Sequence, residues 1–106
     1  QEPLQDISLG VCCGNPTTVA TATASVAGTY FYIMRTEIKD GNNPANGYCY
    51  GRKNANGLGE FGQNTTTHVY AGIAVLSSGD TLSLVCQGNA GGYKARSPSV
   101  VAIKIG

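Results

Sequence analysis

The four cysteines carry the most distinctive chemistry in this sequence. They stand at positions 12, 13, 49 and 86 of a 106-residue chain, an even number without the Cys-X-X-Cys spacing of zinc sites. The single histidine, His68, completes no familiar zinc pattern with them. We predict two disulfides and an oxidising compartment, with four buried free thiols as the alternative; the residues concerned are Cys12, Cys13, Cys49 and Cys86.

Three connectivities are open for these two disulfides. Successive residues of an extended chain point to opposite sides, so Cys12 and Cys13 could each bond a different partner. One of them would then bond Cys49 and the other Cys86. The sequence does not indicate which goes with which.

Catalytic chemistry has little support among the remaining residues. Nucleophilic catalysis needs a base beside the nucleophile, and the only histidine, His68, stands at the start of a predicted strand, where a structural role is favoured. Asp80 lies in a predicted tight turn and should cap backbone N–H groups there. No hydrolase, metalloprotease or nucleotide-binding motif occurs. We therefore expect neither enzymatic activity nor a cofactor.

Two groups of polar and aromatic residues are the candidate ligand-binding sites. Tyrosine supplies a large ring and arginine a planar set of donors, a pairing that anchors recognition surfaces. Tyrosine beside asparagine or glutamine also suits sugars. The alternative is that the tyrosines cover the end of the fold and the basic residues keep the surface soluble. We expect these residues on loops: Tyr48, Tyr50, Arg52, Lys53 and Asn54 in the first group, and Tyr93, Lys94 and Arg96 in the second.

The composition predicts what kind of scaffold positions these residues. Only 12% of residues are charged, the net charge is +1, 42% are hydrophobic and 15 are glycine. Helical bundles and coiled coils need more Glu and Lys, and a neutral chain has no field that attracts nucleic acid or an anionic membrane. The length suits one domain, residues 1–106.

The order of apolar and turn residues predicts seven or eight short strands in a compact antiparallel β-sandwich. Residues 29–38 are apolar on both faces in their first half, which predicts an interior strand between two packed layers. Asn56-Gly57 predicts a hairpin turn, and residues 87–98 a glycine-rich loop. The other predicted strands are 4–13, 17–27, one beginning at 48, 69–76, 81–86 and 99–105.

Three stretches resemble the C1q/TNF-like jelly-roll family. Residues 28–34 resemble that family's glycine-aromatic strand, residues 71–84 its strand, Gly-Asp turn and strand, and residues 91–93 its last loop. The match covers about residues 28–106 in order. It implies an all-β jelly roll that assembles as a homotrimer. The paired aromatic residues that usually end a C1q-type domain are absent here, where residues 100–105 are aliphatic apart from one lysine.

One loop offers oxygen ligands for calcium. Asp40, Asn42 and Asn43 lie together in a glycine-containing segment, and calcium prefers such oxygen atoms. Some C1q-like domains bind calcium, so the resemblance implies the same for this loop. Residues of these types also form turns, which is the favoured interpretation.

Our first functional hypothesis is a secreted homotrimeric recognition module that binds a glycan or a protein, without nucleic acid or membrane insertion. The start at Gln1-Glu2-Pro3, without methionine, fits a mature secreted chain after signal cleavage or an arbitrary boundary. A structural or adhesive extracellular component that self-associates is the second hypothesis. The receptor-binding head of a phage or bacterial fibre is the third.

Overall fold

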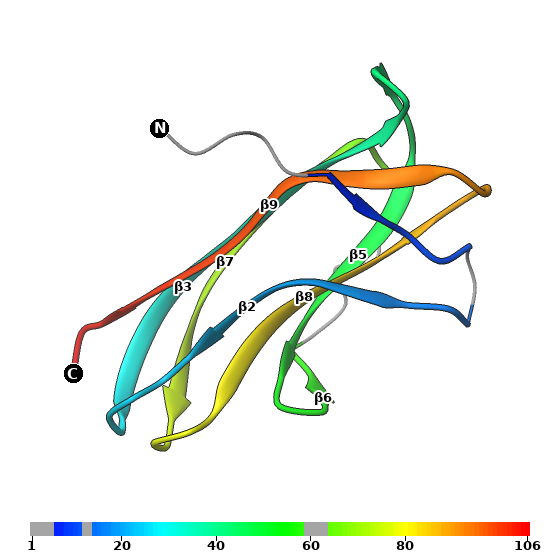
Figure 1. Cartoon of the computed structure of the whole chain (residues 1–106). Helices are drawn as coiled ribbons and strands as arrows, with labels where there is room; N and C mark the ends of the chain where they lie inside the picture. Colours follow the sequence, from blue (N-terminus) through cyan, green and yellow to red (C-terminus); the bar gives the residue numbers. More distant parts are fainter. Residues whose placement is uncertain (1–5, 12–13, 59–63) are drawn as a thin grey trace.

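The chain folds into two antiparallel β-sheets stacked as a compact, jelly-roll-like sandwich, as the sequence predicts (Figure 1). This computed structural model describes residues 6–11, 14–58 and 64–106. The described part holds no helix long and apolar enough to cross a membrane. The first sheet has the order β1, β9, β3, with β7 and β4 on the far edge of β3. Its strands are β1 (Asp6–Ser8), β9 (Tyr93–Lys104), β3 (Gly28–Asp40), β7 (Thr67–Leu76) and β4 (Asn43–Pro44).

The second sheet has the order β2, β8, β5, β6 and packs against the inner face of the first. It comprises β2 (Thr17–Thr23), β8 (Thr81–Gly88), β5 (Gly47–Lys53) and β6 (Asn56–Gly57). Alternation along each strand builds the core, because every second side chain points inward. The largest buried side chains from β3 and β8 are Tyr30, Tyr32, Met34, Ile38, Leu82 and Leu84.

A disulfide joins the two central strands of the second sheet. Cys49 of β5 and Cys86 of β8 lie directly opposite one another, and both are fully buried. The prediction that these two cysteines are disulfide-bonded is confirmed. The expectation that each bonds one of Cys12 and Cys13 is wrong, because strand register places Cys49 against Cys86 instead. Cys12 and Cys13 lie outside the described residues.

The long strand β3 is interior to its sheet, as predicted, with β9 on one edge and β7 on the other. Its outer face, however, is not packed under a second layer. Ile33 pairs with Ala71 and Val101, and the next row joins Phe31 to Ile73 and Ile103. Ile73 is 65% exposed and Ile103 is 58% exposed. The apolar outer face of this sheet is therefore on the surface of the single chain.

Two turn predictions need correction. The hairpin between β5 and β6 turns at Asn54 and Ala55, and Asn56–Gly57 forms the return strand. Asn54 has a positive φ of 55°, which asparagine tolerates better than most residues. The loop predicted over residues 87–98 ends early, because β9 begins at Tyr93 and pairs with both β3 and β1.

The segment predicted as a first strand is shorter than expected. Only Asp6–Ser8 pairs regularly, with β9, and Val11 makes an isolated parallel bridge to Gly88. The second strand ends at Thr23 rather than at residue 27. β2 pairs with β8, which the sequence predicts as a strand, whereas β1 pairs with residues 94–96, which the sequence predicts as a loop.

Candidate functional site

The structure separates the two predicted binding groups onto opposite sheets. Residues 48–53 lie along β5 of the second sheet, with Asn54 in the following turn, whereas residues 93–96 begin β9 of the first sheet. All of them except Asn54 are therefore on strands rather than loops, which corrects the sequence-based placement. The two groups thus lie on different sheets. Their roles in binding remain predictions.

The first group presents its aromatic residues on the outer face of the second sheet. Tyr48, Tyr50 and Arg52 are half-buried and alternate with the inward-facing Gly47, Cys49 and Gly51. Register places three β8 residues opposite them, and a β2 threonine extends the row beyond Ser83. We call this surface the tyrosine face; it consists of Tyr48, Tyr50, Arg52, Ser83, Val85, Gln87 and Thr21, of which Ser83 and Val85 are buried.

Tyr50 and Arg52 form the ordered centre of the tyrosine face. The Arg52 Nη2 donates a hydrogen bond to the Tyr50 hydroxyl at 2.6 Å, and the guanidinium carbon lies 5.1 Å from the centroid of the Tyr50 ring. A guanidinium near an aromatic ring is attracted by the ring's charge distribution. The pair is thus held in place before any ligand arrives, with ring and donors side by side.

Hydroxyl and amide groups surround this pair. Ser83, opposite Arg52, shares a hydrogen bond of 3.2 Å with the Thr21 hydroxyl. Gln87, opposite Tyr48, accepts a hydrogen bond at 2.9 Å from the backbone N–H of Gly14. We did not identify Ser83, Gln87 or Thr21 from the sequence, although the alternation of β8 (Thr81–Gly88) places the first two on one face.

The last two residues of the first group connect the β5–β6 hairpin to the end of β7 and to the β7–β8 turn. The Lys53 Nζ donates to the Val75 carbonyl oxygen at 3.0 Å, and the Asn54 amide donates to Asp80 Oδ1 at 3.2 Å. Asp80 also accepts from the Ser77 backbone N–H at 2.8 Å, which confirms its predicted role in the turn. These hydrogen bonds from Ser77 and Asn54 lower the pKa of Asp80.

The second group lies at the start of β9, where Arg96 is held by an ion pair. Its guanidinium donates to both carboxylate oxygens of Asp6, at 3.0 and 3.2 Å, and to Asn42 Oδ1 at 3.4 Å. The hydrogen bond and charge of Arg96 lower the pKa of Asp6. Lys94 pairs in register with Lys39. Tyr93 packs on the core instead of facing solvent fully.

A β-bulge between β3 and β9 opens a pocket beside Arg96. Thr36 faces two residues of β9, Ser97 and Pro98, and its hydroxyl donates to the Arg96 carbonyl oxygen at 3.0 Å. The pocket has a volume of about 480 Å³. We call it the bulge pocket; its walls are Arg35, Thr36, Glu37, Lys39, Arg96, Ser97 and Ser99.

The calcium prediction concerns the β3–β4 hairpin. Asp40 pairs with Asn43, and Gly41 takes a positive φ of 63° in the turn between them. Asn42 directs its oxygen to the Arg96 guanidinium. Within residues 6–11, 14–58 and 64–106, no three His, Cys, Asp or Glu side chains gather as a metal site would need. The hairpin geometry accounts for these residues as turn formers.

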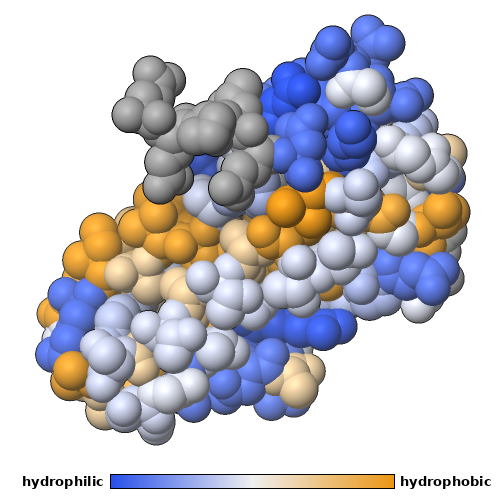
Figure 2. Space-filling model, in the orientation of Figure 1, coloured by the Kyte–Doolittle hydropathy of each residue, from blue (hydrophilic) through white to orange (hydrophobic). Residues whose placement is uncertain are grey.

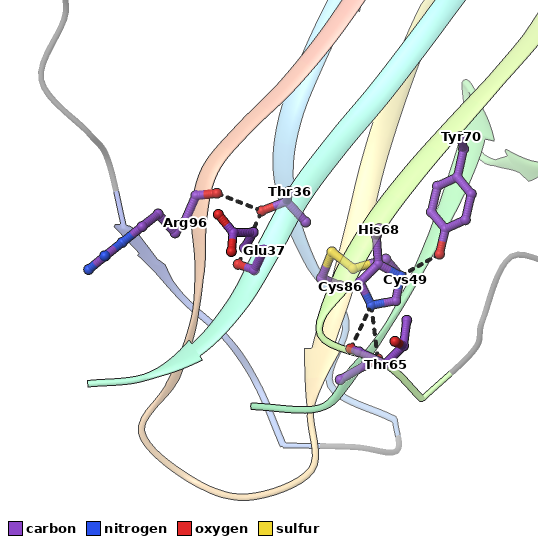
Figure 3. The surroundings of a disulfide bond; sticks show 9 residues. Thr36, Glu37, Cys49, Thr65, His68, Tyr70, Cys86 and Arg96 are labelled. Atoms are coloured by element: carbon purple, nitrogen blue, oxygen red, sulfur yellow. Dashed lines mark hydrogen bonds between the residues drawn. A yellow bond between two sulfur atoms is a disulfide. The ribbon is translucent and has the colours of Figure 1, made fainter. Parts of the chain in front are cut away.

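His68 lies in the core beside the Cys49–Cys86 disulfide, with only 1% of its surface exposed (Figure 3). Its Nδ1 is hydrogen-bonded to the Tyr70 hydroxyl, and its Nε2 lies 3.0 Å from the carbonyl oxygens of Gly47 and Thr65. Carbonyls only accept, so Nε2 carries the proton and Nδ1 accepts from Tyr70. Burial lowers the pKa of His68 and raises that of Tyr70 to about 12. The neutral ring joins β7 to β5.

Acidification is expected to destabilise the protein through His68. The folded-state pKa lies below the ordinary value of about 6.5, so the unfolded chain binds the proton more readily. The contribution of neutral His68 to the free energy of unfolding is therefore fully present above pH 6.5 and is lost as the pH drops toward the folded-state pKa. Urea unfolding at pH 7.5 and pH 5 should show a lower midpoint at pH 5. An equal or higher midpoint at pH 5 would contradict this account of the ring.

No known family model matches this chain, and no curated protein matches it in sequence. The C1q/TNF-like resemblance consequently stays a prediction based on the residues that carry it.

Proposed function

We propose that this chain is an extracellular recognition module that binds a glycan on the tyrosine face. The observation that carries the proposal is the Tyr50–Arg52 pair, ordered by a hydrogen bond and by a guanidinium near the ring. A sugar offers C–H groups that stack on an aromatic ring and hydroxyls that bond to planar donors. The exposed Thr21 hydroxyl lies in the row of Arg52, beyond the buried Ser83, and the Gln87 amide lies in the row of Tyr48.

The same proposal includes assembly as a homotrimer through the outer face of the first sheet. Figure 2 shows hydrophobic side chains gathered on the side along which β9 and β3 run. Monomeric soluble proteins rarely expose a contiguous apolar face of this kind. We call these residues the apolar rows: Phe31, Ile33, Val69, Ala71, Ile73, Val75, Val101 and Ile103.

Three features support trimerisation and secretion. The C1q/TNF-like resemblance implies a threefold assembly, and a closed ring would remove the apolar rows from water. A net charge of +1 gives copies little mutual repulsion. The Cys49–Cys86 disulfide is compatible with an oxidising compartment.

A glycan array probed with the native protein tests the binding role. We expect the wild-type protein to bind a subset of glycans, and Tyr50→Ala to lose at least tenfold in affinity because the stacking surface is gone. Tyr50→Phe keeps the ring and loses only the hydrogen bond to Arg52, so it should retain more binding than Tyr50→Ala. Lys104→Ala, at the end of β9 in the other sheet, is the matched surface control.

Two results would contradict the glycan proposal. If the array stays blank while the protein still forms higher assemblies, the structural or adhesive hypothesis is favoured. If Tyr50→Ala binds glycans as the wild type does, with an unchanged melting temperature, the tyrosine face is not the site. Capture of a purified protein ligand by a chain that binds no glycan would assign the recognition role to a protein surface instead.

A further inference from the structure

Basic residues are concentrated at one end of the outer face of the first sheet. Arg35 pairs with Ser99, Glu37 with Arg96, and Lys39 with Lys94 in consecutive rows. The apolar rows end here, at Val69, which pairs with Arg35 on its other side. Four of the chain's seven basic residues therefore lie in these three rows. The carboxylates of Glu37 and Asp6 offset two of these four positive charges. The local charge is therefore +2, twice the net charge of the whole chain.

The two carboxylates already form ion pairs with particular basic side chains. Asp6 binds the Arg96 guanidinium with both oxygens, and Glu37 Oε2 lies 3.6 Å from the Lys39 Nζ. Arg35 is exposed, and its side chain makes no hydrogen bond or ion pair with the residues that the structure describes. A guanidinium has five N–H donors and binds planar anions with two parallel hydrogen bonds. The wall of the bulge pocket thus carries a cation whose donors face solvent.

Ser97, on the β9 side of the pocket, has an unfavourable backbone conformation. Its φ is 47°, in the left-handed region that serine seldom adopts, and its buried hydroxyl oxygen has no hydrogen-bond partner. Backbone strain and unpaired buried polar atoms both destabilise a fold and are frequent at binding sites. The strained residue, the bulge and the unpaired arginine all line one pocket of about 480 Å³. Small-molecule sites occupy about 300–1,000 Å³, so the pocket has a suitable size.

We propose that the bulge pocket binds an acidic sugar residue, one that carries a carboxylate or a sulfate beside free hydroxyls. Arg35 would bind the anionic group, while the hydroxyl of Ser99 would bond to the sugar. Glu37 retains acceptor capacity beyond Lys39, which suits a ligand with hydroxyl donors and disfavours a bare, highly charged anion. This site lies on the sheet opposite the tyrosine face and does not depend on binding there.

Titration of the ¹⁵N-labelled protein with three monosaccharides tests the proposal. The probes are methyl glucuronide, methyl glucoside 6-sulfate and neutral methyl glucoside. We expect an acidic probe to shift the backbone amides of Ser97 and Ser99, with a dissociation constant in the millimolar range, and neutral glucoside to bind at least tenfold more weakly. Comparison of the carboxylate and sulfate probes identifies which anionic group the pocket prefers.

Variants distinguish binding of the acidic probe in this pocket from its non-specific electrostatic attraction to the protein. Arg35→Ala should weaken the acidic probe at least tenfold, and Arg35→Lys should recover only part of it because a lysine lacks the planar pair of donors. Lys104→Ala removes the same charge from β9 outside the pocket and should bind as the wild type does. Three results would each overturn the proposal. They are amide shifts with neutral glucoside equal to those with the acidic probe, an affinity for inorganic sulfate equal to that for the acidic probe, and unchanged binding of the acidic probe by Arg35→Ala. The Tyr50→Ala variant tests the tyrosine face on the other sheet. Whether it loses glycan-array binding does not affect the test of the bulge pocket.

Discussion

Replacement of Cys49 and Cys86 together by alanine is expected to lower the free energy of unfolding by about 3–4 kcal/mol, because the crosslink no longer restricts the unfolded chain. The two cysteines are separated by 37 residues in sequence, and both are fully buried between β5 and β8. A loss of this size would lower the melting temperature of a domain of this length by about 15 °C or more.

Calorimetry of the two proteins measures this loss, and both are held at equal concentration because the assembly that we propose would make the melting temperature depend on concentration. The wild-type protein unfolded with a reductant present is the control, and its midpoint should move close to that of the double variant. A double variant that melts within about 3 °C of the oxidised wild type would contradict a stabilising role for the disulfide.

Replacement of Ile73 by lysine is expected to convert the trimer that we propose into monomers. Ile73 lies near the middle of the apolar rows, beside Phe31 and across β3 from Ile103, and it is 65% exposed in the single chain. Burial of an unpaired ammonium between copies would cost far more than the lost contact alone. Because the side chain faces outward, the folded monomer should keep its circular dichroism spectrum. Size-exclusion chromatography with light scattering measures the change.

Thr67→Lys is the matched control for this prediction. Thr67 lies on the same strand and the same outer face, but in the row of Glu37, outside the apolar rows. The added charge is identical, so this variant should stay trimeric. An Ile73→Lys variant of unchanged mass would show that the apolar rows do not form the subunit interface.

Much of the fold could be predicted from residue patterns, because alternation determines which side of a strand is buried. Alternation in residues 29–38 indicated two apolar faces and an interior strand, but it did not indicate which face packs on the core: Tyr32 and Met34 point inward, and Ile33 is on the surface. The packed layer predicted over the second apolar face is not provided by this chain, where Ile73 and Ile103 are exposed. The turn role of Asp80 followed from its position in a Gly-Asp turn.

Features that depend on register between distant residues could not be predicted. The Cys49–Cys86 pairing arises from the alignment of β5 with β8, which no local pattern specifies. The bulge pocket likewise joins Arg35 to Ser99 across 64 positions of sequence. The start of β9 at Tyr93 was missed because glycines precede it, although its pairing with β1 and β3 extends the strand. The buried hydrogen bonds of His68 had no signal in the sequence.

The central claim is that this chain works as a trimeric recognition module whose apolar rows are closed between copies. The mass of the native, oxidised protein at micromolar concentration tests it most directly, by light scattering during size-exclusion chromatography. The prediction is three times 10.9 kDa, or about 33 kDa. A single species of 10.9 kDa that persists on concentration would contradict the claim, and with it the assembly that the C1q/TNF-like resemblance implies.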